Sequence, residues 1–108
     1  MTKQLQAEIK TIVDQLVTHY KPEKIILFGS GARGEATDES DLDILVVKKT
    51  DDNYHDRVRE VSHFLSSQRP LDIVVLTPDE LTKAVDEKRL FIRQIFKYGT
   101  TLYEASAQ

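Results

Sequence analysis

Three short apolar runs constrain the fold of this chain more than any other feature of the sequence. Each has the length of a strand and is bounded by polar or turn residues, and they cover Lys24 to Phe28, Asp41 to Val47 and Leu71 to Leu76. The glycine-bearing stretch between the first two, residues 29–40, is too short for a crossover helix with its loops, although one helical turn near Gly31 to Glu35 would fit. We therefore expect strands at all three runs.

Amphipathic helices are expected before and between these strands. The first ends before Pro22, and its apolar residues recur at helical spacing at Leu5, Ile9, Ile12, Val13, Leu16, Val17 and Tyr20. A second helix can be capped by Asp51-Asp52-Asn53. Its inner face would carry Val58, Val61, Phe64 and Leu65.

The C-terminal third also carries helix signals. Thr77-Pro78-Asp79-Glu80 has an N-cap threonine, a proline at the first helical position and a glutamate at the third, which is the capping-box pattern. Apolar residues follow at Leu81, Val85, Leu90, Phe91, Ile95 and Tyr98. We expect two helices here with a break near Asp86 to Lys88, a stop at Gly99 and a short edge strand from Thr100 to Tyr103.

A glycine-serine loop and a pair of aspartates stand at the ends of the first two runs. Gly29-Ser30 follows the first run, and after ten intervening residues Asp41-Leu42-Asp43 opens the second. Glycine lets the backbone approach a triphosphate, the serine hydroxyl and exposed N–H groups donate to its oxygens, and Arg33 can add a charged donor. Alternate strand residues share a face, so Asp41 and Asp43 would lie about 7 Å apart, close enough to hold one divalent cation.

A third carboxylate, Asp72, lies inside the third apolar run. An aspartate opposes strand propensity and costs desolvation unless it is exposed, hydrogen-bonded or beside a cation. Together these features predict a site in which Asp41 and Asp43 hold Mg²⁺ on a triphosphate beside Gly29 and Ser30. Asp72 would deprotonate the attacking hydroxyl or bind a second metal. The structural alternatives are an ordinary turn at Gly29, a solvated strand start at Asp41, and an edge-facing or paired Asp72.

Other motifs point to no competing chemistry. Gly29 to Gly34 also matches GxGxxG, but the long helix that a dinucleotide fold places straight after its last glycine has no room here, and no Gly-Lys-Ser/Thr ending makes a Walker loop. His19, His55 and His63 lack the spacing of a helical metal pair. The basic residues Lys88, Arg89, Arg93 and Lys97 are interpreted as a solvated face of the last helix.

Composition limits the class of protein. The chain has 108 residues, 40% hydrophobic and 31% charged, which fits one domain over residues 1–108. Its 15 basic and 18 acidic residues give a formal charge of -3, which disfavours DNA or RNA as a substrate. The absence of cysteine excludes disulfides and thiolate metal sites. With no apolar run of signal-peptide or membrane-spanning length, we expect a soluble, cytoplasmic protein.

The combined pattern resembles the nucleotidyltransferases of the DNA polymerase β superfamily, whose signature is hG[GS], a spacer and DhDh. Phe28-Gly29-Ser30-Gly31-Ala32-Arg33-Gly34 through Ser40-Asp41-Leu42-Asp43-Ile44 is similar to its minimal, MntA-like branch, and the resemblance covers nearly the whole chain. It implies an α/β (α+β) palm with a mixed β-sheet flanked by helices. It also implies that Asp41 and Asp43 bind Mg²⁺ and that Asp72 is the third carboxylate. Gly31 departs from the pattern, because similar proteins often carry a larger or charged residue there.

The resemblance further implies a function. Minimal members commonly stand beside a helical HEPN protein, an RNase toxin, and act as its antitoxin by transferring AMP from ATP to a tyrosine of that partner. A hetero-oligomer or homodimer would fit such a role. Two alternatives stay open: a protein that neutralises a HEPN partner by contact alone, and an enzyme that modifies a small molecule, as the antibiotic nucleotidyltransferases do.

Overall fold

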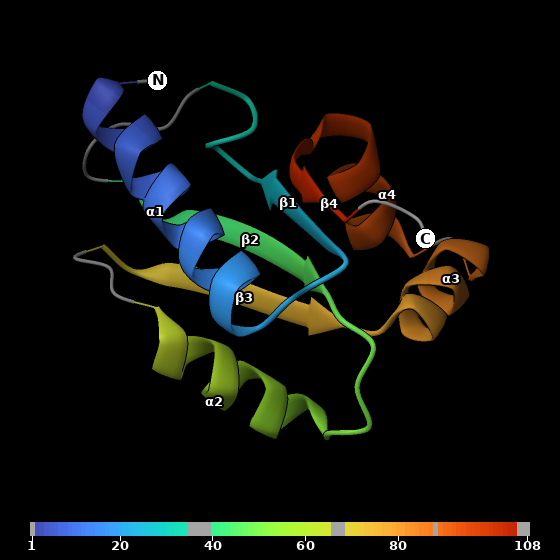
Figure 1. Cartoon of the computed structure of the whole chain (residues 1–108). Helices are drawn as coiled ribbons and strands as arrows, with labels where there is room; N and C mark the ends of the chain where they lie inside the picture. Colours follow the sequence, from blue (N-terminus) through green and yellow to red (C-terminus); the bar gives the residue numbers. More distant parts are fainter. Residues whose placement is uncertain (1, 35–39, 66–68, 88, 106–108) are drawn as a thin grey trace.

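The computed structural model describes residues 2–34, 40–65, 69–87 and 89–105. In these residues four helices and four strands follow one another along the chain (Figure 1). They are α1 (Lys3–His19), β1 (Lys24–Phe28), β2 (Leu42–Val47), α2 (Tyr54–Phe64), β3 (Leu71–Leu76), α3 (Pro78–Asp86), α4 (Leu90–Tyr98) and β4 (Thr100–Glu104). No helix in the described part of the chain is both long and apolar enough to cross a membrane.

The four strands form one mixed sheet in the order β3-β2-β1-β4. β1 is antiparallel to both of its neighbours, whereas β2 and β3 are parallel and are joined by the crossover through α2. The C-terminal residues form an edge strand, β4, as predicted. In this register Asp43 of β2 lies between Phe28 of β1 and Asp72 of β3.

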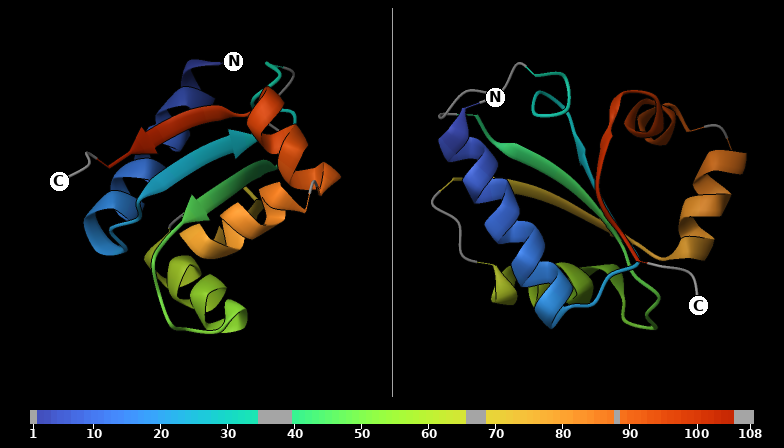
Figure 2. Two further views of the ribbon diagram at one scale, coloured as in Figure 1. Left: turned by 90° about the vertical axis from the view of Figure 1, so that its right-hand side faces the viewer. Right: turned by 45° about the horizontal axis from the view of Figure 1, so that its top comes forward.

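Both faces of the sheet are covered by helices, so that the molecule has three layers (Figure 2). On one face α1 and α2 pack on alternate strand residues, which include Ile25, Leu27, Ile44 and Val46. On the other, α3 and α4 pack on the residues between them, which include Ile26, Leu45 and Val47. Because side chains alternate along a strand, Asp43 and Asp72 point to the side of α3 and α4.

Local signals in the sequence set most element boundaries. Asn53 caps α2, and its side chain accepts a hydrogen bond from the Asp56 N–H. Both bonds of the expected capping box are present at Thr77 and Glu80. A helical turn is expected near Gly31 to Glu35, but residues 31–34 form a hydrogen-bonded turn and no helix: Gly34 N–H donates to the Gly31 carbonyl, and Gly34 has a φ of +75°. Glu35 lies outside the described residues.

Several apolar residues of the last two helices lie outside the core. Ile95 is buried and Leu81 is half-buried, whereas Val85, Leu90, Phe91 and Tyr98 are exposed. Ala84 and Ile92 are also buried in these two helices. α3 ends at Asp86 and α4 begins at Leu90, so each helix packs on the sheet with its own orientation.

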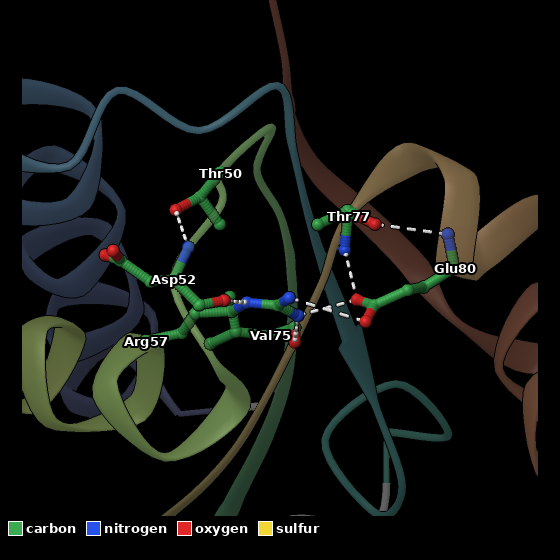
Figure 3. Close-up of polar contacts among 6 residues, drawn as sticks. All are labelled: Thr50, Asp52, Arg57, Val75, Thr77 and Glu80. Atoms are coloured by element: carbon green, nitrogen blue, oxygen red, sulfur yellow. Dashed lines mark hydrogen bonds and ion pairs between the residues drawn. The ribbon is translucent and has the colours of Figure 1, made fainter.

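A buried arginine connects α2 to α3 past the edge of the sheet (Figure 3). Arg57 is only 7% exposed. Its Nε donates to the Asp52 carbonyl at 2.8 Å, and its two terminal nitrogens donate to the Glu80 carboxylate at 2.6 and 3.4 Å. Glu80 also accepts the Thr77 backbone N–H, so one carboxylate serves both the capping box and the buried cation.

This shared carboxylate makes stability depend on pH. The hydrogen bond from Arg57 lowers the pKa of Glu80 below its usual 4.5, so its stabilisation is present above pH 4.5 and is lost as the pH falls through the lowered pKa. We expect Glu80→Gln to cost about 1 kcal/mol at pH 7, a modest value because the Glu80 side chain is 46% exposed. Denaturant titrations should show that this cost is smaller at pH 3 than at pH 7.

The exposed pair of Glu87 and Arg89 supplies a matched control for that prediction. Glu87→Gln should cost close to nothing at either pH, because a solvated ion pair is screened. A Glu80→Gln cost that is the same at pH 3 and pH 7 would contradict the assignment.

Candidate active site

A tight turn at the end of β1 forms the first wall of the site. Gly29 has a φ of +70°, in the left-handed region that favours glycine, and its carbonyl accepts the Arg33 N–H at 3.2 Å. A Cβ atom on Gly29 would overlap Oδ2 of Asp43. The Asp43 carboxylate therefore packs directly against the loop backbone, an approach that only glycine permits.

Asp43 and Asp72 meet on the face of the sheet that α3 and α4 cover. They are directly in register on the parallel strands β2 and β3, and their side chains are close enough to share a hydrogen bond when one of them is protonated. The pKa of Asp43 is raised most by partial burial, next by hydrogen bonding to Asp72, and then by the negative charges of Asp72 and Asp41. The Arg33 guanidinium acts in the opposite direction and lowers the pKa of Asp43.

Asp41 lies one residue before β2 and is exposed, and its charge acts on Asp43. Asp72 is also exposed, on the edge strand β3, so exposure and pairing with Asp43 already account for an aspartate in that strand. Among the residues that the structure describes, no three side chains of the His, Cys, Asp or Glu type are arranged to hold a metal ion. The structure thus brings Asp43 and Asp72 together and leaves Asp41 at the margin of the pair.

The chemistry of these carboxylates nevertheless fits a hard cation. Carboxylate oxygens are ligands that Mg²⁺ prefers, and Mg²⁺ typically takes only one or two from protein together with phosphate oxygens and waters. Partial burial is the largest cause of the raised pKa of Asp43, and the hydrogen bonding and charge of Asp72 and the charge of Asp41 add to it, so a cation bound there would favour the ionised carboxylate. Two further acidic residues of the sequence, Asp38 and Glu39, lie outside the described part of the chain.

A second buried arginine positions the approach to β2. Arg69 donates to the Ser40 carbonyl at 2.7 Å and to the Glu8 carboxylate of α1 at 2.6 Å. The Leu42 N–H donates to the Pro70 carbonyl at 3.2 Å. These contacts fix the chain on both sides of Asp41 to the start of α1 and to the segment before β3.

A pocket of about 380 Å³ opens beside Asp43. It is lined by Phe28, Gly29, Arg33, Asp43, Phe91, Gln94 and Tyr98. Gly29, Arg33 and Asp43 are predicted site residues, whereas Ser30 lies half-buried in the same loop. Gly31 is buried against the Leu27 side chain, which restricts the room for a larger residue at that position.

Three lining residues of α4 are absent from the sequence-based site. Phe91, Gln94 and Tyr98 are spaced three and four residues apart, so they share one helix face. Interpreting this helix as a solvated basic face is correct for Arg89, Arg93 and Lys97, which are exposed, while Lys88 lies outside the described residues. The sequence does contain a signal for this face: Phe91 and Tyr98 form an aromatic stripe next to the buried aliphatic stripe of Ile92 and Ile95.

A mixed sheet with a glycine loop after its first strand and paired carboxylates on the next two is the arrangement of a nucleotidyltransferase palm. The chain belongs to the family described as Polymerase beta, Nucleotidyltransferase, whose model matches residues 10–108. The family and the fold therefore agree with the resemblance carried by Gly29-Ser30 and Asp41-Leu42-Asp43.

Two curated relatives come from Methanocaldococcus jannaschii. "Putative protein adenylyltransferase MJ0604" is 52% identical over 48 residues, which are 43% of this chain and 48% of the relative. "Putative protein adenylyltransferase MJ1379" is 52% identical over 44 residues, 37% of this chain and 44% of the relative. The matching segments thus span somewhat less than half the length of each relative.

Solved structures share the fold over nearly the whole chain. A crystal structure of "a putative nucleotidyltransferase from Sulfolobus solfataricus" has a TM-score of 0.62 and 26% identity, and the match covers 96% of this chain and 89% of the other. A structure described as "the toxin-antitoxin with AMP-PNP" has a TM-score of 0.60 and 25% identity, covering 90% and 73%. Spectinomycin adenyltransferase AAD(9) from Enterococcus faecialis, with ATP and spectinomycin, shares the fold alone at 14% identity, with a TM-score of 0.65 and coverage of 94% and 57%.

Proposed function

We propose that residues 1–108 act as one minimal nucleotidyltransferase domain that transfers AMP from ATP to a hydroxyl group of a protein, namely a tyrosine. One observation carries this proposal: the Asp43 carboxylate lies against the Gly29 backbone, in register with Asp72, at a pocket that Arg33 also lines. This arrangement supports one site in which these residues would bind phosphate, hold a cation and accept a proton. The names of both curated relatives, as protein adenylyltransferases, agree with it.

Each predicted residue has a role in this proposal. Gly29 and Ser30 bind triphosphate oxygens through backbone N–H groups and the hydroxyl, and Arg33 adds a positive charge. Asp41 and Asp43, with Asp72 beside them, would hold Mg²⁺, which when bound neutralises phosphate charge. The family implies this cofactor, and the carboxylate pair supplies ligands that suit it.

The proposed reaction is a nucleophilic displacement at phosphorus. The acceptor hydroxyl oxygen forms a bond to the α-phosphorus of ATP, the bond from that phosphorus to the β-bridging oxygen breaks, and pyrophosphate leaves. Asp72 accepts the proton of the hydroxyl, because it is the exposed member of the carboxylate pair and can meet an incoming acceptor.

The proposed partner is a HEPN-type toxin, which the chain would neutralise as an antitoxin in a hetero-oligomer. The similarity to a structure described as a toxin-antitoxin with AMP-PNP supports this context and an ATP-like donor. The formal charge of -3 argues against a nucleic-acid acceptor. The use of ATP as donor favours a cytoplasmic location for this protein, because ATP is available in the cytoplasm.

The direct test is transfer of label from ATP, with Mg²⁺, to the protein encoded by the neighbouring gene. α-Labelled ATP should label the partner, and γ-labelled ATP should not, because pyrophosphate carries the γ-phosphate away. Replacing the acceptor tyrosine of the partner with phenylalanine should abolish labelling. Neutralisation of the partner without any label would instead favour an antitoxin that acts by contact alone.

Asp72→Asn tests the proton-accepting role separately from nucleotide binding. The amide can still donate a hydrogen bond to Asp43 but cannot accept a proton from the acceptor hydroxyl. We expect turnover to fall about a hundredfold or more, with ATP affinity close to that of the wild type. Single-turnover transfer rates and calorimetric binding would measure the two quantities.

The exposed Asp86 at the end of α3 provides the matched control, and Asp86→Asn should behave like the wild type in both measurements. If Asp72→Asn also transfers at the wild-type rate, another group accepts the proton.

A further inference from the structure

The helix α4 presents an aromatic face that the core does not use. Phe91 and Tyr98 are 51% and 56% exposed, although both are large apolar residues. Gln94 lies between them on the same face, and all three line the 380 Å³ pocket that contains Asp43. The buried face of the helix is formed by Ile92 and Ile95, whereas the rings of Phe91 and Tyr98 stay about half exposed.

The pocket has two chemically different walls. One wall is the turn after β1 and the neighbouring strand, with Gly29, Arg33 and Asp43. The other is α4, with two aromatic rings and one amide. A nucleotide has the same division, because its phosphates are charged and its base is a flat, aromatic group with hydrogen-bonding edges.

The two walls are held together by a specific ring contact. Phe28, the last residue of β1, packs edge-to-face against Phe91, with ring centroids 5.6 Å apart and an interplanar angle of 90°. Such a pair fixes the orientation of the Phe91 ring next to the glycine loop. The volume of about 380 Å³ is in the range of small-molecule sites.

We infer that Phe91, Gln94 and Tyr98 form the base-binding wall of the site and select adenine. This inference rests on the proposed function, since it assigns the other end of the same ATP molecule. Phe91 and Tyr98 provide aromatic surfaces on which the base stacks, and Gln94 provides the amide that pairs with the edge of the base.

The amide gives a physical reason for adenine over guanine. A glutamine side chain offers one donor and one acceptor group, which match the N7 acceptor and the N6 donor of adenine. Guanine presents two acceptors, O6 and N7, at the corresponding edge, so the acceptor oxygen of Gln94 would face another acceptor.

Separate binding of ATP and of inorganic tripolyphosphate tests the inference. Calorimetry with Mg²⁺ and each ligand should show that Phe91→Ala and Tyr98→Ala each lower the affinity for ATP about tenfold or more, because base stacking is lost. Tripolyphosphate affinity should stay within about twofold of the wild type, because its contacts are to the glycine loop. Thermal melts would verify that each variant is folded.

Phe96→Ala is the matched control on the same helix. Phe96 is also an exposed aromatic residue, 42% exposed, but it contacts Lys24, whose Nζ lies 5.8 Å from the ring centroid, and it is not a lining residue of the pocket. Its variant should bind both ligands like the wild type.

The outcomes separate this inference from the proposed function. Unchanged ATP affinity in Phe91→Ala and Tyr98→Ala would overturn the inference, and reduced labelling of the partner in those variants would then assign the two rings to a protein interface. Wild-type protein that binds tripolyphosphate as tightly as ATP would also overturn it, while leaving the phosphate site intact. Wild-type protein that binds neither ligand would overturn the proposed function and the inference together.

The ratio of ATP to GTP affinity tests the amide. Gln94→Ala should lower that ratio about tenfold, while the affinity for tripolyphosphate is kept. An unchanged ratio would overturn the assignment of adenine selection to Gln94.

Discussion

Asp43→Ala is expected to lower AMP transfer about a thousandfold while the protein remains folded with an equal or higher melting temperature. The carboxylate would contact the cation and the triphosphate, so its loss removes stabilisation of the charge that moves during transfer. The fold should not suffer, because partial burial and the nearby charges of Asp72 and Asp41 raise the pKa of Asp43, which means that its ionised form is disfavoured in the folded protein.

Labelling of the partner with α-labelled ATP measures the first effect, and calorimetric melting measures the second. Asp43→Asn is a useful companion, because it keeps the shape of the side chain and its capacity to bond to Asp72 while removing the charge. Both variants should be inactive. Transfer at the wild-type rate by either variant would remove Asp43 from the proposed site and favour an antitoxin that works by contact.

The second large effect is expected at the glycine loop. Gly29→Ala should lower transfer at least a hundredfold more than Gly34→Ala does. Both glycines have positive φ angles, +70° and +75°, so alanine costs about 1–2 kcal/mol of backbone strain at each position. Only at Gly29 does the new Cβ atom overlap the Asp43 carboxylate, whereas at Gly34 nothing lies within 4 Å.

Gly34→Ala is therefore a control for strain without displacement of the carboxylate. The two variants should lose similar thermal stability, apart from the added overlap in Gly29→Ala, and differ widely in transfer rate. Equal losses of transfer in the two variants would show that the loop acts through its general backbone shape and not through its contact with Asp43.

The strands and their pattern are predictable because the signals are local. An apolar run of strand length between polar residues, as in β1 and β3, cannot stay exposed to water. Caps at Asn53 and Thr77 likewise act within one helical turn. The alternation of strand side chains also predicts, from three consecutive residues alone, that Asp41 and Asp43 point to the same side of the sheet.

The site is predictable only in part, because its walls come from distant segments. Gly29 and Asp43 belong to a linear motif, whereas Phe91 and Tyr98 reach the pocket only because α4 docks beside the end of β1. In the sequence these aromatic residues form a stripe beside that of Ile92 and Ile95, but nothing in their spacing tells which of the two stripes faces the core. Their exposure depends on how α4 is rotated about its own axis. α3 does not fix that rotation, because the two helices are not continuous.

Local patterns in the sequence were enough to predict the elements, the turn at Gly29 and the shared strand face of Asp41 and Asp43, because propensity, capping and alternation act over a few residues. That Asp72 lies opposite Asp43, and that Phe91 lines the same pocket, follows only from the folded structure. The register of two parallel strands joined by a crossover helix, and the rotation of a docked helix, are set by packing between segments far apart in the chain.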